Sequence, residues 1–378
     1  MDFYNPMYWA YESGRYTEWG SVYPPLNFLI LKIISFFFDG SRYGDPSLIR
    51  ENSSFVTFGF GLTYLLGLAL VLKTKIWKDF TVNEKSLIYF SMIFSTPLLF
   101  ALERGNLILL VPLLLATALS EIAFLRALSI ALLINFKPYF ALLLFYYIFR
   151  KNLKGFLSCM IIAGFIFILS GLELDKNFLD FFVNLFSFSK DDALFSLRDL
   201  MAMPSSVSAF SYALNNQDGA AFVAEFLGSM MFTLIANVIE VAKWSVLTFS
   251  LAILAVRSRL VSDAEILSIL VVVICNLGIW VGGYTFVLYI TLIPIFIKMR
   301  KKHLYIAFLT LIEMPLDLVP LFSAFIGEQY SYLSDANVNV HWVLGLGSVV
   351  RPILNLVLLL SLSHEIFKRK PKSISGRL

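Results

Sequence analysis

The sequence is poor in charge and in cysteine. Of its 378 residues only 15% are Asp, Glu, Lys or Arg, and it holds two Cys and three His. Cys159 and Cys275 lie in separate apolar runs without zinc or redox spacing, so they read as small core residues. Neither a Walker loop nor an HExxH motif nor an internal repeat is present, which argues against coupling to ATP. We expect no metal and no cofactor.

Apolar residues are abundant instead. Hydrophobic residues make up 58% of the chain and aromatic residues 16%, and the mean hydropathy is +0.78. These values lie outside the range of soluble domains and predict a polytopic integral membrane protein. The net charge of +4 does not indicate nucleic acid as a partner, because the basic residues do not form one solvated patch.

Long apolar runs predict eleven membrane-spanning segments and an all-α fold. A full span takes about 20 residues, so we expect the short runs between 106 and 149 to be broken or strongly packed helices. The expected segments are 55–72, 86–102, 106–120, 122–136, 138–149, 155–172, 241–257, 265–281, 284–297, 304–326 and 342–364. The expected regions are an outer segment (1–54), a transmembrane module (55–172), an outer loop and helix (173–240), and a second transmembrane module with a basic tail (241–378).

Lys and Arg in the connecting segments predict the orientation. When the eleven segments are threaded in order, every basic cluster falls on one side, which the positive-inside rule makes cytoplasmic. The clusters lie within 73–85, 150–154, 257–259, 298–302 and 368–377. The N-terminus, 103–106, Lys137, 173–220, Gly282-Gly283 and 327–341 then share the outer side. Because the chain opens on that side without a signal peptide or first span, we expect a missing N-terminal helix. The alternative is insertion by the later helices.

The first 23 residues are rich in aromatic side chains. Tyr4, Tyr8 and Tyr11 have the i, i+4, i+7 spacing of one helix face, and such rings settle at the headgroup level of a membrane. They form either a plain interfacial belt or a surface that stacks on sugars. Pro24-Pro25 can open a helix, and the run 26–38, interrupted by Lys32, is expected to lie along the outer surface.

Two polar interruptions separate apolar runs on that side. They are Glu103-Arg104-Gly105-Asn106 and Lys137-Pro138-Tyr139. Polar residues in such places usually line a cavity, bind a ligand or end a span. Together with Asp2, the aromatic segment and Tyr23-Pro24-Pro25-Leu26, they resemble the polyprenyl-phosphate-sugar-dependent glycosyltransferases of the GT-C fold, most closely glycosyltransferase family 87. The resemblance covers residues 2–150 by motif and the remainder by hydropathy alone, and it lacks the family's first helix.

The resemblance implies a GT-C-type bundle of about 11 transmembrane helices with an extracytoplasmic N-terminal segment of surface helices. It implies transfer of a hexose, commonly mannose, from a polyprenyl-phosphate donor to a glycolipid or polysaccharide acceptor, with inversion, at the outer face of a bacterial plasma membrane. Asp2 matches the family's acid and is the expected general base, with Glu12 in reserve. The partners are then the lipid-linked donor, the acceptor and membrane lipids.

A departing lipid phosphate needs cations placed where its charge develops. Arg104 and Lys137 are the first candidates, and His341 and Arg351 are further ones. Glu103 can orient Arg104 or simply pair with it in a loop, and Asn106 can cap the following helix. Arg351 can instead pair with Asp317 or Glu313, since an unpaired charge in a membrane is costly. The expected substrate-binding or orienting residues are Tyr8, Tyr11, Tyr23, Glu103, Asn106 and Tyr139.

Two further expectations concern plainer features. Gly282-Gly283 is expected to form a tight turn between two segments. Glu240 and Lys243 are expected to form a surface pair on a helix that includes 221–240. The rival functions are a flippase or transporter for a lipid-linked sugar and an O-antigen-type polymerase. A transporter is expected to carry polar residues at mid-span on several helices, whereas here they concentrate at the outer boundary.

Overall fold

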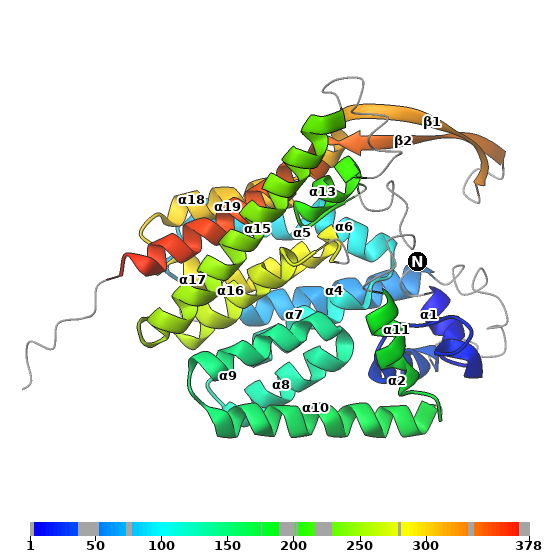
Figure 1. Cartoon of the computed structure of the whole chain (residues 1–378), viewed down its shortest axis with the longest axis horizontal. Coiled ribbons are helices and arrows are strands. Elements are labelled where there is room, and N and C mark those ends of the chain that lie inside the picture. The colour runs from blue at the N-terminus through cyan, green and yellow to red at the C-terminus, as the bar shows by residue number, and fades with distance from the viewer. Residues whose placement is uncertain are drawn as a thin grey trace, which may run out of the picture.

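The computed structural model shows a mostly helical molecule whose helices run side by side (Figure 1). It describes residues 4–36, 53–72, 78–174, 176–188, 201, 203–215, 229–278, 281–331 and 336–369. Asp2 lies outside these residues.

The first half contains α1 (Tyr4–Trp9), the 3-10 helix η1 (Ser13–Arg15), α2 (Pro25–Ser35), α4 (Ser53–Leu72), α5 (Val82–Ile93), α6 (Thr96–Glu103), η4 (Leu107–Leu110), α7 (Val111–Ala118), α8 (Ala123–Phe136), η5 (Pro138–Leu144), α9 (Phe145–Phe149), α10 (Leu153–Leu174) and α11 (Asp180–Phe188). The second half contains α13 (Ser208–Asn215), α15 (Ser229–Arg257), η7 (Ser258–Leu260), α16 (Asp263–Cys275), η8 (Gly283–Leu292), α17 (Ile293–Phe296), α18 (Lys302–Glu313), η9 (Leu316–Leu318), strands β1 (Pro320–Ser331) and β2 (Ala336–Gly345), and α19 (Leu346–Phe367).

Each expected spanning segment overlaps a helical part of the described chain. Four helical runs are long and apolar enough to cross a membrane: Val82–Glu103, Leu153–Leu174, Thr233–Leu260 and Leu346–Phe367. Shorter apolar helices include Leu107–Ala118, Ala123–Phe136 and Pro138–Phe149. The membrane-embedded class is therefore supported, and the count of eleven spans stays a prediction.

The expected breaks between 106 and 149 are confirmed. Pro112 lies in the first turn of α7 and Pro138 in the first turn of η5, where a proline needs no backbone N–H. Asn106 begins η4, and its Oδ1 accepts a hydrogen bond of 2.9 Å from the N–H of Ile108, as the sequence predicted. Pairs of short helices thus replace single straight spans.

Most of the described chain is helical, in keeping with the expected all-α fold, but residues 320–331 and 336–345 form two strands instead. Helix α18 ends at Glu313, before Met314-Pro315, so 304–326 is not one helix. Strands β1 and β2 pair antiparallel from Pro320–Gly345 to Ser331–Ala336, with irregularities beside Pro320 and Phe325. The described parts of the expected outer loop 327–341, residues 327–331 and 336–341, therefore belong to β1 and β2, and the segment expected to begin at 342 starts as a helix only at Leu346. An alternation of Asn and Val from Asn337 to Val340 is the period-2 signal for the second strand.

The expected surface pair of Glu240 and Lys243 is corrected, and the Gly282-Gly283 pair lies between two segments as expected. Lys243 lies 2.6 Å from Glu240 in α15, but its side chain is buried, so this is not a surface pair. Its Nζ also donates to the hydroxyl of Ser208 in α13. Gly283 begins η8, and its N–H donates to the carbonyl of Met203 at 2.7 Å. A Cβ on Gly283 would lie 2.8 Å from that carbonyl oxygen, so a close approach of two chain segments requires glycine there.

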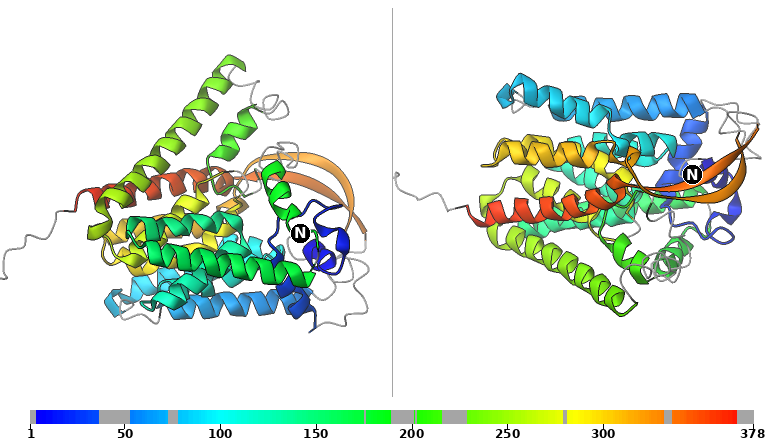
Figure 2. Two further views of the ribbon diagram at one scale, coloured as in Figure 1. Left: turned by 60° about the horizontal axis from the view of Figure 1, so that its bottom comes forward. Right: turned by 90° about the horizontal axis from the view of Figure 1, so that it is seen from above.

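The molecule has two different ends (Figures 1 and 2). The hairpin, α13 and the N-terminal helices gather at one end, which we call the hairpin end. The connections α9–α10, α15–α16 and α17–α18 and the end of α19 gather at the other, the basic end, as threading the segments predicted. Direct contacts join these connections: Arg369 bonds Glu265 at 2.6 Å, and Lys298 reaches Ser262 at 3.4 Å.

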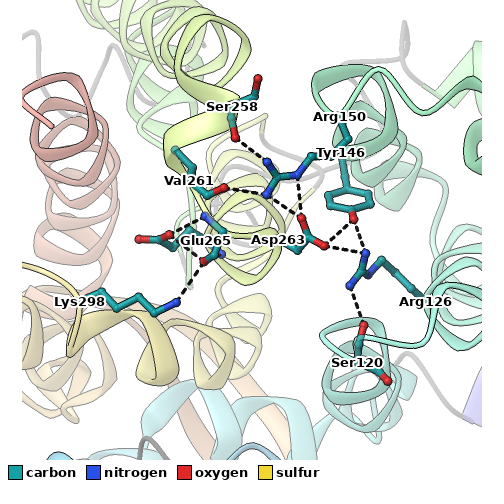
Figure 3. A network of polar contacts seen from close by, with 10 residues as sticks. Ser120, Arg126, Tyr146, Arg150, Ser258, Val261, Asp263, Glu265 and Lys298 are labelled. Carbon is teal, nitrogen blue, oxygen red and sulfur yellow. Dashed lines mark hydrogen bonds and ion pairs between the residues drawn. The ribbon is translucent and has the colours of Figure 1, made fainter. Parts of the chain in front are cut away.

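Asp263, the first residue of α16, organises the basic end (Figure 3). Its two carboxylate oxygens lie 2.8 Å from Arg126 and 2.6 Å from Arg150, and the hydroxyl of Tyr146 donates to it at 2.8 Å. Burial alone raises the pKa of Asp263, but the Tyr146 hydrogen bond and the two guanidinium charges outweigh it and lower the pKa below its usual range. One carboxylate thus ties α8 and α9 to α16.

We predict that Asp263→Asn lowers the thermal unfolding midpoint of the detergent-purified protein by about 2–4 °C at neutral pH. The reason is that it removes both ion pairs. Because the folded carboxyl has a lowered pKa, its contribution is present above the unfolded pKa of about 3.9 and is lost as the pH falls below it, so the two proteins converge in acid. Exposed Glu121, between α7 and α8, provides the control Glu121→Gln, which should not move the midpoint. Equal midpoints for Asp263→Asn and wild type at neutral pH would contradict the prediction.

Candidate functional site

The N-terminal segment folds against the helices at the hairpin end. Arg15 is 2% exposed, and its guanidinium donates to three carbonyls: Trp9 and Ala10 at the end of α1, and Leu174 at the end of α10. These distances are 3.0–3.1 Å. Arg15 therefore closes the N-terminal segment on itself and fastens it to α10.

Two asparagines add to this attachment. Asn184 in α11 donates to the carbonyls of Tyr16 and Ser21 at 2.8 and 3.2 Å. Asn27 in α2 is fully buried and donates to the carbonyls of Asn135 and Phe136 at 3.3 and 2.9 Å. Those carbonyls lie in the last turn of α8, which Lys137-Pro138 ends. The segment thus satisfies backbone groups that the break in α8–η5 leaves without helical partners.

Tyr23 and Lys137, which were predicted from separate motifs, lie together. The Lys137 ammonium is 4.2 Å from the centre of the Tyr23 ring, within the range of a cation–π contact. Lys137 has extended backbone (φ −145°, ψ 125°), as a residue before proline prefers. Both side chains are partly exposed. Tyr139 follows in η5, with its ring 4.9 Å from that of Phe140.

Arg104 lies at the end of α6. Its guanidinium is 5.3 Å from the centre of the Phe100 ring, and that ring is 6.2 Å from Tyr284 at the start of η8. Gly105 follows with φ +58°, a conformation that favours glycine after a helix. Glu103 is exposed, Arg104 is partly exposed and Asn106 is buried. Asn106 thus shapes the turn, while the two charged residues remain accessible.

The three tyrosines of the first segment do not share one helix face. Helix α1 ends at Trp9, and the carbonyls of Trp9 and Ala10 bond Arg15, so Tyr11 lies beyond the helix. Tyr11 instead bonds the hydroxyl of Ser35 in α2. The ring of Tyr8 lies 5.6 Å from that of Trp19. Glu12 follows at the start of η1 and is partly buried.

The two remaining predicted cations belong to the hairpin and its base. His341 is exposed on β2, with its ring 5.5 Å from that of Phe325. Arg351 is fully buried in α19 and lies 2.5 Å from Asp317, which confirms one of its two expected partners. It also donates to the carbonyls of Ile312 and Met314, both at 2.7 Å. These bonds commit Arg351 to the chain itself rather than to a ligand.

Three residues that hold this site together, Arg15, Asn27 and Asn184, were not predicted from the sequence. Asn27 and Asn184 are isolated polar residues in apolar surroundings, which is the one signal they gave, whereas Arg15 lies among other polar residues and gave none. Among the described residues, no group of three His, Cys, Asp or Glu is placed to hold a metal ion. No protein-family model, curated protein or solved structure matches this chain.

We predict that Arg15→Gln loosens the N-terminal segment. Glutamine cannot reach three carbonyls at once, and each lost bond to a charged group costs about 1.5–3 kcal/mol. Amides of residues 4–23 should then exchange hydrogen for deuterium at least about tenfold faster than in the wild type. Thr17→Ala changes an exposed side chain in the same turn and should leave exchange unchanged. Protection at the wild-type level in Arg15→Gln would refute the anchoring role.

Proposed function

We propose that the chain is a membrane glycosyltransferase of the GT-C type. In this proposal it moves a hexose from a polyprenyl-phosphate donor to a glycolipid or polysaccharide acceptor at the hairpin end of the molecule. The contact between Lys137 and Tyr23 carries the proposal. It brings a cation from a break between apolar helices against the aromatic N-terminal segment.

The proposed reaction combines a proton transfer, the formation of one bond and the breaking of another. A carboxylate takes the proton of the acceptor hydroxyl, the acceptor oxygen forms a bond to the anomeric carbon, and the bond from that carbon to the phosphate oxygen breaks with its electrons on the phosphate. Attack opposite to the leaving phosphate inverts the anomeric centre. Lys137 and Arg104 are proposed to stabilise the charge on the phosphate, and Asp2, or Glu12 in its place, is proposed as the base.

The surroundings suit a lipid-linked donor. Lys137 and Arg104 both lie where apolar helices end, so a phosphate could meet them while its polyprenyl chain stays among lipid tails. Partly exposed Tyr8 and Tyr23 offer aromatic faces for a sugar ring. The basic end is then cytoplasmic by the positive-inside rule, and the hairpin end extracytoplasmic. Eleven spans and a bacterial plasma membrane belong to the same proposal.

We predict sugar transfer by membranes that contain the chain, assayed with a panel of labelled polyprenyl-phosphate hexoses. Lys137→Met keeps the length and the packing of the side chain but removes its charge, and it should lower transfer about 10²-fold or more. Arg104→Gln should act similarly. Lys137→Arg, which retains the charge, should keep more activity than Lys137→Met.

Controls separate loss of chemistry from loss of folding. Lys154→Met removes an exposed charge at the basic end and should retain full transfer. Asp2→Asn and Glu12→Gln, assayed side by side, identify which acid acts as the base. Donor binding without transfer by the wild type for every hexose would count against the enzyme and favour a flippase. Full activity of both Lys137→Met and Arg104→Gln would remove the proposed phosphate site.

A further inference from the structure

Glu313, the last residue of α18, is a buried acid that forms no ion pair with the described residues. Its side chain is fully buried, and within the described residues neither carboxyl oxygen has a hydrogen-bond partner. Two other buried acids differ from it. Glu84 lies 2.9 Å from Lys302, and Glu265 lies 2.6 Å from Arg369. Sequence analysis offered Glu313 as a partner of Arg351, but Asp317 takes that place.

Around Glu313, burial opposes a negative charge most strongly, and the groups that favour it are the hydroxyl of Ser95 and the more distant guanidinium of Arg351. Tyr64 donates its hydroxyl proton to the carbonyl of Met92, and Tyr289 donates its proton to Asn355. Charged residues of α5 and α18 pair at the opposite end of α18, where Glu84 meets Lys302 and His303. The polar and titratable groups close enough to interact electrostatically with Glu313 are Tyr64 of α4, Ser95 before α6, Cys275 of α16, Tyr289 of η8 and Arg351 of α19.

Arg351 is the one cation in that set, and its guanidinium is already bound. It donates to the carbonyls of Ile312 and Met314, the two neighbours of Glu313, and to the carboxylate of Asp317. An ionised carboxylate buried without a partner is strongly unfavourable, whereas a protonated carboxyl is neutral. The surroundings of Glu313 therefore favour the protonated form.

The same guanidinium holds the base of the hairpin. Asp317 packs so closely on Gly345 that a Cβ there would lie 2.6 Å from the Asp317 backbone. A Cβ on Gly347 would lie 2.5 Å from both the Asp317 carboxylate and the Arg351 guanidinium. The N–H of Leu346 bonds the carbonyl of Val319 at 2.8 Å. Any movement of Arg351 away from Asp317 must therefore disturb the junction of η9, β2 and α19.

We propose that Glu313 is a proton-binding site, that its carboxyl is neutral in this structure, and that its ionisation competes with Asp317 for Arg351 and loosens the base of the hairpin. The ligand of the site is a proton. The site is independent of the glycosyltransferase proposal, because it rests on α18 and α19 rather than on Lys137 and Tyr23.

Thermal stability measured against pH tests the proton. The detergent-purified wild type is compared with Glu313→Gln, whose amide has the shape of the protonated acid. In the folded protein the Glu313 carboxyl keeps its proton, whereas in the unfolded chain it releases that proton above about pH 4.3. The wild type should therefore lose stability relative to Glu313→Gln as the pH rises from about 5 to about 8. Glu121→Gln, an exposed acid replaced in the same way, should follow the wild type. The proposal is overturned if the thermal stabilities of wild type and Glu313→Gln change in parallel with pH. It is also overturned if Glu313→Gln is much less stable than the wild type at about pH 5.

Hydrogen–deuterium exchange tests the link to the hairpin. Wild type and Glu313→Gln are compared at each pH, so that the chemical pH dependence of exchange cancels. Amides of β2 should exchange faster in the wild type at alkaline pH, by about threefold or more, and equally in the two proteins at acid pH. Asp317→Asn removes the carboxylate that competes for Arg351, so that the guanidinium can stabilise ionised Glu313. This variant should shift the midpoint of the stability change to lower pH. Equal exchange at every pH would separate the proton site from the hairpin and refute the proposed coupling.

Carbodiimide labelling gives an internal comparison. Dicyclohexylcarbodiimide modifies protonated carboxyls in apolar sites, and peptide mass spectrometry locates the product. Glu313 should be labelled near neutral pH, with labelling declining at alkaline pH, while ion-paired Glu265 should stay unmodified. Labelling of Glu265 as strong as that of Glu313 would contradict the distinction between the two buried acids.

Discussion

Helix ends inside an apolar interior must find hydrogen-bond partners within the chain, and the structure depends on how this need is met. Arginine side chains satisfy many of these helix ends. Arg15 bonds the end carbonyls of α1 and α10, and Arg351 bonds carbonyls at the end of α18. Arg150 reaches the carbonyls of Ser258 and Val261, beside η7. A guanidinium suits this role because it carries several donors in one plane and keeps its charge.

This constraint explains why the centre of the molecule can be built from short pieces. From Glu265 to Cys275 every side chain of α16 is buried, and η8 and α17 are buried over most of their length. Two helices that expose large apolar side chains, α10 with Ile161 and α15 with Val241, are long and apolar enough to cross a membrane. These two long helices thus carry apolar side chains on the outside of the molecule, whereas short buried helices lie inside, where neighbouring chain segments satisfy their free backbone groups.

Local patterns in the sequence were enough to predict some features. The breaks at Pro112 and Pro138 and the Asn106 cap follow from rules that involve only a few neighbouring residues. The pairing of Arg351 followed from the cost of a lone buried charge. The hairpin was missed because the apolar residues of β1 continue the run expected to span 304–326, and because the short alternation of Asn and Val in β2 lies in the segment expected to be an outer loop.

Other features were beyond the reach of local patterns. Nothing near Asp263 in sequence shows that Arg126 and Arg150 meet it. The burial of Lys243 likewise depends on Ser208, which lies on another helix. At the candidate site, the approach of Lys137 to Tyr23 depends on Arg15 and Asn27, whose partners are backbone carbonyls. Carbonyls carry no sequence signature, so the residues that position the site are the hardest to predict.

The two ends of the molecule use their charges differently. At the basic end, Asp263 and Glu265 are matched with Arg126, Arg150 and Arg369, which favours a rigid junction. At the hairpin end, Glu313 has no hydrogen bond among the described residues, and Lys137 stands over an aromatic ring. A buried group whose charge is not compensated has an energy that changes with its protonation, and a partly exposed cation at a helix break can gain an anionic partner. If Glu313 and Lys137 act as proposed, the groups that respond to a proton and to a phosphate both lie at the hairpin end, while the ion pairs of the basic end hold the opposite ends of the helices together.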